Sequence, residues 1–174
     1  MADSYFELGK ASKISAASEG IPGHRHFYLL IESEAGLARL WLEKEQLFQM
    51  ALGIQRLLSS ATFDELDEQT DLKKIEFNPQ LDLDFVIDKL ALGRQGREKS
   101  FVLTASELVS NEDESEQSEE GVNIEVRLNK NQLNFLSNQA LEVCAAGRPL
   151  CPLCGVPVGN ERHICARTNG HVKL

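Results

Sequence analysis

Three cysteines and a histidine lie within one short segment near the end of the chain, CPLCGVPVGNERHIC. Cys151 and Cys154 form a C-x-x-C pair followed by a glycine, a spacing at which a tight turn brings two thiolates together. His163 and Cys165 supply a second pair further along. Because zinc prefers four sulfur or nitrogen ligands in a tetrahedron, we expect one zinc ion to be bound by these side chains: Cys151, Cys154, His163 and Cys165.

Other interpretations of this segment stay open. The H-x-C spacing is shorter than usual for a second ligand pair, and His171 could replace His163 as the nitrogen ligand. A redox dithiol is disfavoured because thiol activation needs a following helix or a cationic setting, and the glycines and proline after Cys154 interrupt a helix. A pair of structural cysteines without metal is a further alternative. With four protein ligands a zinc site is closed, so we expect it to fold the tail rather than to catalyse a reaction.

The remaining candidates for chemistry have simpler explanations. Cys144 falls on the apolar stripe of a predicted helix, so we assign it to the core, where cysteine behaves as a small hydrophobic residue. His24 and Arg25, in the segment GHRH, could contact an anion or a metal, but we favour a turn that leads into a strand. Three aspartates alternate with apolar residues and are predicted to form the wet face of a strand rather than a cation site: Asp82, Asp84 and Asp88. The sequence contains no phosphate-binding loop, nucleophile elbow or dinucleotide-binding motif.

Two amphipathic helices are the clearest elements expected to position these residues. The first carries an apolar stripe at helical spacing: Leu47, Met50, Ala51, Ile54, Leu57 and Leu58. The second has a matching stripe: Leu133, Leu136, Ala140, Val143 and Cys144. Asn129 with Gln132 predicts a capping pair at the start of this helix, and Gly147 with Pro149 predicts its end.

Extended segments precede each helix. They are predicted over residues 6–10, 27–33, 81–88, 101–107 and 121–128. Residues 34–36, EAG, predict a tight hairpin turn before a short extended segment, LARLWL (37–42). Residues 109–121 are strongly acidic and contain no aromatic residue, so we expect a solvated loop there.

The order of the elements predicts an internal duplication. LWLEKEQLFQM (40–50) matches VRLNKNQLNFL (126–136) without gaps, FYLLIES (27–33) answers FVLTASE (101–107), and FELGK (6–10) answers FVIDK (85–89). We therefore expect an α+β fold in which two β-β-β-α units form an antiparallel sheet of about six strands with two helices. The predicted organisation is a first repeat (1–60), an acidic linker (61–80), a second repeat (81–147) and a zinc-binding tail (148–174).

Charge and composition limit the class of function. The net charge is −9, and because the segment 147–174 holds four Arg or Lys against one acid, that segment is +3 and the rest −12. An acidic body argues against nucleic acid as a partner, since phosphate contacts need a positive footprint. No apolar run is long enough to cross a bilayer and the N-terminus does not read as a signal peptide, so we expect a cytoplasmic protein whose thiols stay reduced.

The segments FYLLIE and LEKEQ, together with the tail AAGRPLCPLCGVPVGNERHICARTNGH, resemble an uncharacterised bacterial family of about 180 residues whose members end in a GRP-x-CPLCG…H-x-C-x-R-x-NG tail. The resemblance implies metal-binding positions at the four predicted ligands, with Arg148, Arg167, Asn169 and Gly170 in the surrounding signature. It implies no activity.

From these features we expect a protein without catalytic machinery, an interaction or adaptor module that presents a zinc-bound, basic tail to a protein partner. The alternative is an enzyme or a binder of a small anionic or phosphorylated ligand in a cleft between the two repeats. In that case His24, Arg25 and Arg167 are the expected contacts.

Overall fold

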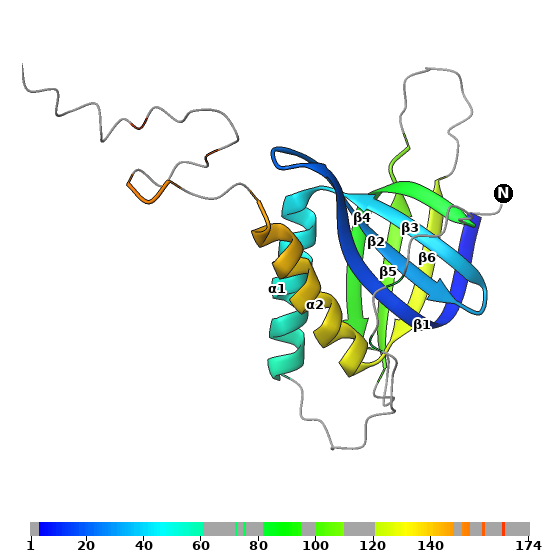
Figure 1. Ribbon diagram of the computed structural model, residues 1–174. Coiled ribbons are helices and arrows are strands. Elements are labelled where there is room, and N and C mark those ends of the chain that lie inside the picture. Colours follow the sequence, from blue (N-terminus) through cyan, green and yellow to red (C-terminus); the bar gives the residue numbers. More distant parts are fainter. Residues whose placement is uncertain are drawn as a thin grey trace, which may run out of the picture.

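The computed structural model describes residues 4–60, 72, 75, 82–94, 100–109, 121–147, 151–153, 158 and 165. The element order is β1 (Ser4–Ile21), β2 (His24–Ser33), β3 (Gly36–Leu42), α1 (Lys44–Ser60), β4 (Leu83–Arg94), β5 (Phe101–Glu107), β6 (Val122–Leu128) and α2 (Lys130–Ala145). Three strands followed by a helix therefore occur twice, which confirms the predicted α+β class with six strands and two helices (Figure 1).

The six strands form one closed barrel in chain order. Within each half the neighbouring strands are antiparallel, as expected. The two places where the halves meet are parallel: β3 pairs with β4, and β1 pairs with β6. A helix between successive strands returns the chain to the same end of the sheet, which makes β3 and β4 parallel neighbours. The two halves thus share one sheet rather than forming separate units.

Strands β1 and β4 each pair with one neighbouring strand along one segment and with the other neighbouring strand along the next segment. Residues 4–10 of β1 pair with β6, and residues 11–21 pair with β2. The pairing with β6 shifts register between Glu7 and Gly9, where Gly9 has a φ of 70° that favours glycine. β4 pairs first with β3 and then, beyond Val86, with β5. Such irregularities bend a strand, and here they allow the sheet to close.

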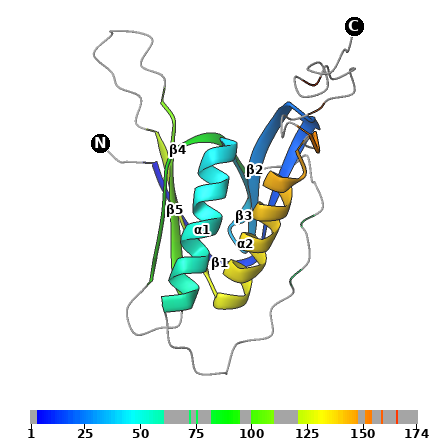
Figure 2. The ribbon, with the colours of Figure 1, turned by 90° about the vertical axis from the view of Figure 1, so that its left-hand side faces the viewer.

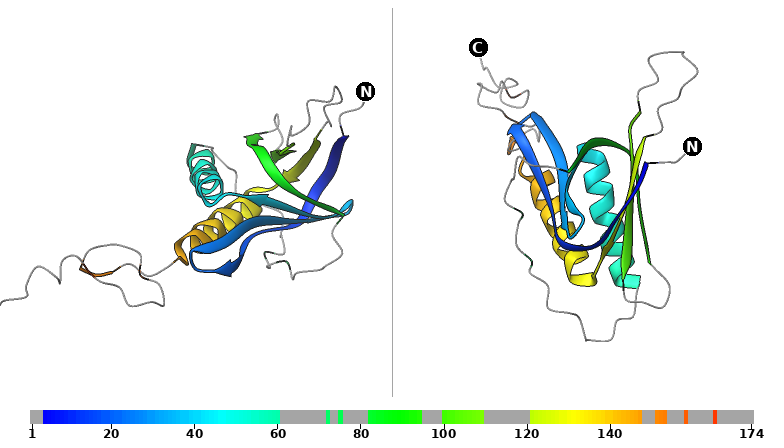
Figure 3. Two further views of the ribbon diagram at one scale, coloured as in Figure 1. Left: turned by 90° about the horizontal axis from the view of Figure 1, so that it is seen from above. Right: turned by 90° about the vertical axis from the view of Figure 1, so that its right-hand side faces the viewer.

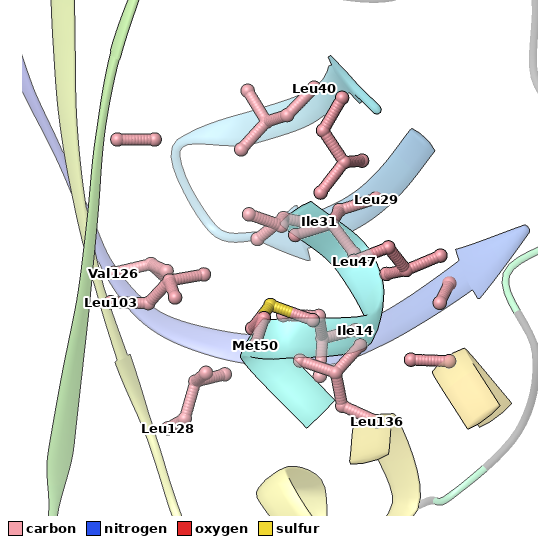
Figure 4. Packing of buried hydrophobic residues seen from close by; sticks show 14 of the residues in the cluster. Ile14, Leu29, Ile31, Leu40, Leu47, Met50, Leu103, Val126, Leu128 and Leu136 are labelled. Carbon is pink, nitrogen blue, oxygen red and sulfur yellow. The ribbon is translucent and has the colours of Figure 1, made fainter. Parts of the chain in front are cut away.

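Helices α1 and α2 lie side by side against the concave face of the strongly curved sheet (Figure 2). Figure 3 shows from two further directions that the strands curve around the side on which the helices lie. The predicted stripe of α1 is confirmed, with Leu47, Met50, Ala51 and Ile54 buried. Figure 4 shows Leu47 and Met50 of this stripe in the same core as side chains of the strands, among them Leu29, Leu40, Leu103 and Val126. None of the helices in the described part of the chain is long and apolar enough to cross a membrane.

The start and the end of α2 agree with those predicted from the sequence. The Asn129 side chain accepts a hydrogen bond from the Gln132 backbone N–H, and the Gln132 side chain accepts one from the Asn129 N–H, which confirms the capping pair. The α2 helix ends at Ala145, two residues before Gly147. Residues 34 and 35 form the turn between β2 and β3, as predicted. The acidic loop lies outside the described residues apart from its two ends, as does all of the linker except Leu72 and Ile75.

Candidate functional site

Two of the four predicted zinc ligands are described, and they lie together. The Sγ atoms of Cys151 and Cys165 are 3.9 Å apart, and both residues are buried, with 7% and 5% of their surfaces exposed. A disulfide needs a separation of about 2.05 Å, so the two sulfurs are not bonded. Two thiolates bound to one tetrahedral zinc at about 2.3 Å lie about 3.8 Å from each other. The spacing of Cys151 and Cys165 therefore fits a shared metal ion.

The rest of the predicted tail site lies outside the described residues: Cys154, His163, His171, Arg148, Arg167 and Asn169. Among the residues that the structure describes, no three His, Cys, Asp or Glu side chains gather in a way that could hold a metal. The complete ligand set is thus a prediction that Cys151 and Cys165 support in part.

Cys144 belongs to the core, as the sequence predicts. It is buried on α2, and its Sγ lies 3.8 Å from the carbonyl oxygen of Lys44 at the start of α1. Burial raises the pKa of the Cys144 thiol, because the thiolate would lose its hydration. A protonated, buried thiol is a poor nucleophile and a poor metal ligand.

His24 and Arg25 are the first residues of β2, directly after the turn at Pro22 and Gly23. Arg25 pairs with Gly20 across the hairpin, where a Cβ would collide with the carbonyl oxygen of His24. The φ of Gly20 is also positive, at 96°, so this hairpin needs glycine there. The expected turn leading into a strand is confirmed.

A cluster that the sequence did not predict lies on the outer face of the barrel where β3 meets β4. Arg39 and Asp84 are direct partners in the parallel pairing, and the guanidinium donates two hydrogen bonds to the carboxylate, at 3.0 and 2.5 Å. The indole N–H of Trp41 donates a third hydrogen bond to Asp84, at 2.8 Å. The guanidinium carbon of Arg39 lies 4.5 Å from the centre of the Trp41 ring.

Aromatic side chains of β2 extend this cluster. Tyr28 meets Trp41 edge to face, with ring centres 5.0 Å apart, and the ring centre of His26 lies 6.4 Å from that of Trp41. The hydrogen bond from Arg39 holds the pKa of the Asp84 carboxyl below its usual value, and the same bond raises the pKa of Arg39. Burial raises the pKa of Tyr28. The cluster is therefore an ion pair fixed against aromatic rings.

The other parallel junction carries a related arrangement. On the outer face of β1 and β6, Arg127 lies 3.4 Å from the carboxylate of Glu7, and the Tyr5 hydroxyl donates a 2.5 Å hydrogen bond to Glu125. That hydrogen bond raises the pKa of Tyr5 to about 12. Each junction between the halves is thus joined by a cross-strand ion pair as well as by its backbone hydrogen bonds.

One sequence feature could have indicated the first cluster. Trp41 is the only tryptophan of the chain, and it alternates with Arg39 on a strand whose other residues are apolar. A large polar-tipped side chain beside a cation on the wet face of a strand indicates an organised surface. The partner Asp84 could not be identified in this way, because neither the β3 nor the β4 sequence alone determines the register in which these parallel strands pair.

A groove of about 870 Å³ lies between α1 of the first half and β4 of the second. Its apolar residues are Met50, Leu57, Leu90 and Leu92, and its cations are Arg56 and Lys89. Neither His24 nor Arg25 lines it. A cleft between the halves therefore exists among the described residues, without His24 or Arg25 in its lining, and the third expected contact, Arg167, lies outside the described residues.

Comparison with curated proteins and with solved structures finds no match for this chain. A family model described as "Protein of unknown function (DUF3090)" matches residues 6–165, which include nearly the whole barrel, both helices and the predicted zinc ligands. The chain therefore belongs to the DUF3090 family.

Proposed function

We propose that this protein is a protein-interaction module: a barrel that presents a C-terminal tail, residues 148–174, folded around one zinc ion. The observation that carries the proposal is the 3.9 Å separation of the buried Cys151 and Cys165 sulfurs. In this proposal Cys154 and His163 complete the tetrahedron, with His171 as the alternative nitrogen ligand. Zinc binding by thiolates suits a reducing cytoplasm, where we place the protein.

The proposed zinc has a structural role. Four protein ligands leave no position for water or substrate, so the metal would order the tail rather than activate a reactant. The segment 147–174 carries +3 on a chain whose net charge is −9. An ordered basic tail on an acidic body presents one local surface of opposite sign, which favours a protein partner over the extended phosphate backbone of a nucleic acid.

The metal is tested by elemental analysis of the full chain purified without added metal. We expect about one zinc per chain in the wild type and loss of zinc in Cys154→Ser. The matched control is Cys144→Ser, because Cys144 lies in the core and should leave the zinc content unchanged. A wild-type protein without metal would overturn the zinc site and return attention to the dithiol interpretation.

The partner role is tested separately. Arg162 and Arg167 are two of the four Arg or Lys residues of the segment 147–174. Affinity capture with the full chain should retain a defined set of partners that Cys154→Ser and the double variant Arg162→Gln/Arg167→Gln lose, while Cys144→Ser keeps them. Capture of the same partners by all of these variants would show that the tail is not the interaction surface.

A further inference from the structure

The groove between α1 and β4 exists because the two helices pack differently on the barrel. In the second half, α2 is held on β1 by two buried glutamines. The Gln132 amide donates a 2.8 Å hydrogen bond to the carbonyl oxygen of Ala11, and Gln139 accepts one from the N–H of Ala16. The corresponding side of α1 is not seated on β4, and the groove lies there instead.

The floor of this groove is apolar and only partly covered. Leu90 and Leu92 pair with Ala105 and Leu103, which are buried on the inner face of β5, so both leucines point toward the inside of the barrel. They are nevertheless only half-buried, as is Leu57 of α1. Inward-facing leucines left partly exposed to solvent retain hydrophobic free energy that a bound apolar group would release.

Gly53 keeps the groove open on the side of α1. It lies in the middle of the helix, where glycine costs about 1 kcal/mol relative to alanine. A Cβ at Gly53 would have no atom of the described residues within 4 Å, so no packing contact among them requires glycine at this position. The physical effect of the missing side chain is therefore to leave room in the groove.

The charged residues of the groove select the sign of a ligand. Arg56 on α1 and Lys89 on β4 stand on opposite walls, and Asp88 is the one acid among the described lining residues. Asp88 lies 4.0 Å from Lys89, and 46% of the Asp88 side chain and 84% of the Lys89 side chain are exposed, which makes their mutual attraction weak. Two cations against one acid are a local positive excess on a chain of net charge −9.

We propose that the groove between α1 and β4 binds a small molecule with an apolar body and a single anionic head. The leucines and Met50 take the apolar body, and Arg56 and Lys89 bind the head. A groove of about 870 Å³ is of the size that holds such ligands in other proteins. This site is independent of the proposed zinc tail.

The test uses decanoate as the probe and isothermal titration calorimetry on the full chain, below the concentration at which decanoate forms micelles. Wild-type protein is expected to bind decanoate, and Gly53→Leu is expected to weaken binding at least about tenfold because the new side chain fills the groove. Arg56→Gln and Lys89→Gln should each weaken binding about threefold to fivefold, as expected for an exposed charge pair.

The matched control is Gly93→Leu. A Cβ at Gly93 would likewise have no described atom within 4 Å, and Gly93 lies on β4 and is not among the described residues of the groove lining, so this variant should bind as the wild type does. Acetate, which has the head without the body, and decanol, which has the body without the head, should both bind more weakly than decanoate. Failure of the wild type to bind decanoate, or equal binding by Gly53→Leu, would overturn the proposal, including the case in which another part of this chain or a second copy fills the groove.

Discussion

The hydroxyl of Ser137 in α2 donates a 3.0 Å hydrogen bond to the carbonyl oxygen of Ala51 in α1, and both residues are fully buried. These two positions correspond in the gapless match of residues 40–50 with 126–136, continued along the helices. The two helices therefore touch at positions that the sequence match pairs with each other, which is the contact that the predicted duplication would produce. Small side chains at both points let the helix backbones approach closely.

Enlarging this contact is expected to be costly. Ser137→Leu should destabilise the fold by about 3 kcal/mol, because the extra atoms enter a filled helix interface. Ser137→Ala should change stability by less than about 1 kcal/mol, since it removes one hydrogen bond and creates no large cavity. Urea denaturation of both variants measures the difference, and equal stabilities would contradict the close approach of α1 and α2.

The glutamines at the starts of the two helices offer a matched pair. Gln132 caps α2 and also bonds the carbonyl oxygen of Ala11 in the buried interface with β1, whereas Gln46 accepts the Glu43 N–H at the exposed start of α1. Gln132→Ala should therefore cost about 2 kcal/mol or more, because a buried carbonyl loses its partner. Gln46→Ala should cost about 1 kcal/mol or less. Equal losses in the two variants would show that α2 is not anchored through Gln132.

The Arg39–Asp84 pair predicts a loss of stability in acid. The pKa of Asp84 is lowered in the folded protein, so its contribution is present above the ordinary aspartate pKa of about 4 and disappears as the pH falls through the lower, folded value. At neutral pH, Asp84→Asn should cost about 1 kcal/mol, since the pair is partly exposed, and should change the fluorescence of Trp41. Asp88→Asn serves as the control and should leave both unchanged. A fluorescence spectrum unaffected by Asp84→Asn would contradict the hydrogen bond from the Trp41 indole to Asp84.

The raised pKa of Tyr5 predicts that the stability of the fold falls at alkaline pH. Its pKa of about 12 lies above the ordinary value of 10, so the neutral phenol is favoured by folding. The stabilising effect is complete below a pH of about 10 and is lost as the pH rises toward about 12. Absorbance titration of the phenolate band should show Glu125→Gln shifting one of the two tyrosines back toward its ordinary pKa, because the carboxylate that holds the phenolic proton is gone. An unchanged titration curve would contradict the Tyr5–Glu125 hydrogen bond.

Thiol reactivity separates Cys144 from the tail. In native protein that holds zinc, we expect an aromatic disulfide reagent to modify none of the cysteines quickly. After chelation of the metal, the three tail cysteines should react rapidly, and Cys144 should react only on unfolding, because its thiol is buried and its pKa is raised. Rapid labelling of Cys144 in the native protein would place it outside the core.

Local patterns allowed the helices and most of the strands to be predicted. The stripe from Leu47 to Ile54 and the alternation around Phe85 depend only on which side of an element is buried, and periodicity reports that directly. The strand predicted over residues 6–10 continues to Ile21 in the structure. The prediction stops short because small residues such as Ala11 and Ala16 carry little strand signal, although they lie inside the barrel.

Relations between distant strands could not be predicted in the same way. The predicted duplication aligns Phe6 with Phe85. Phe6 is 44% exposed and Phe85 is 6% exposed, so the two side chains do not share an environment. The Asp84 carboxylate was expected only to face water, and its contacts with Arg39 and Trp41 depend on the parallel register. For the tail, the sequence predicts ligands by chemistry and spacing, and the distance between Cys151 and Cys165 agrees with it.

The double pairing of β1 sets an order of events during synthesis. β1 leaves the ribosome before every other strand of the barrel, yet one of its two partners, β6, leaves after all of them. The barrel therefore cannot close until β6 has emerged, and the inner face of β1 stays incompletely covered until then. Pairings that span nearly the whole body slow folding and make it cooperative, so we expect the barrel to unfold as one unit rather than as two separable halves.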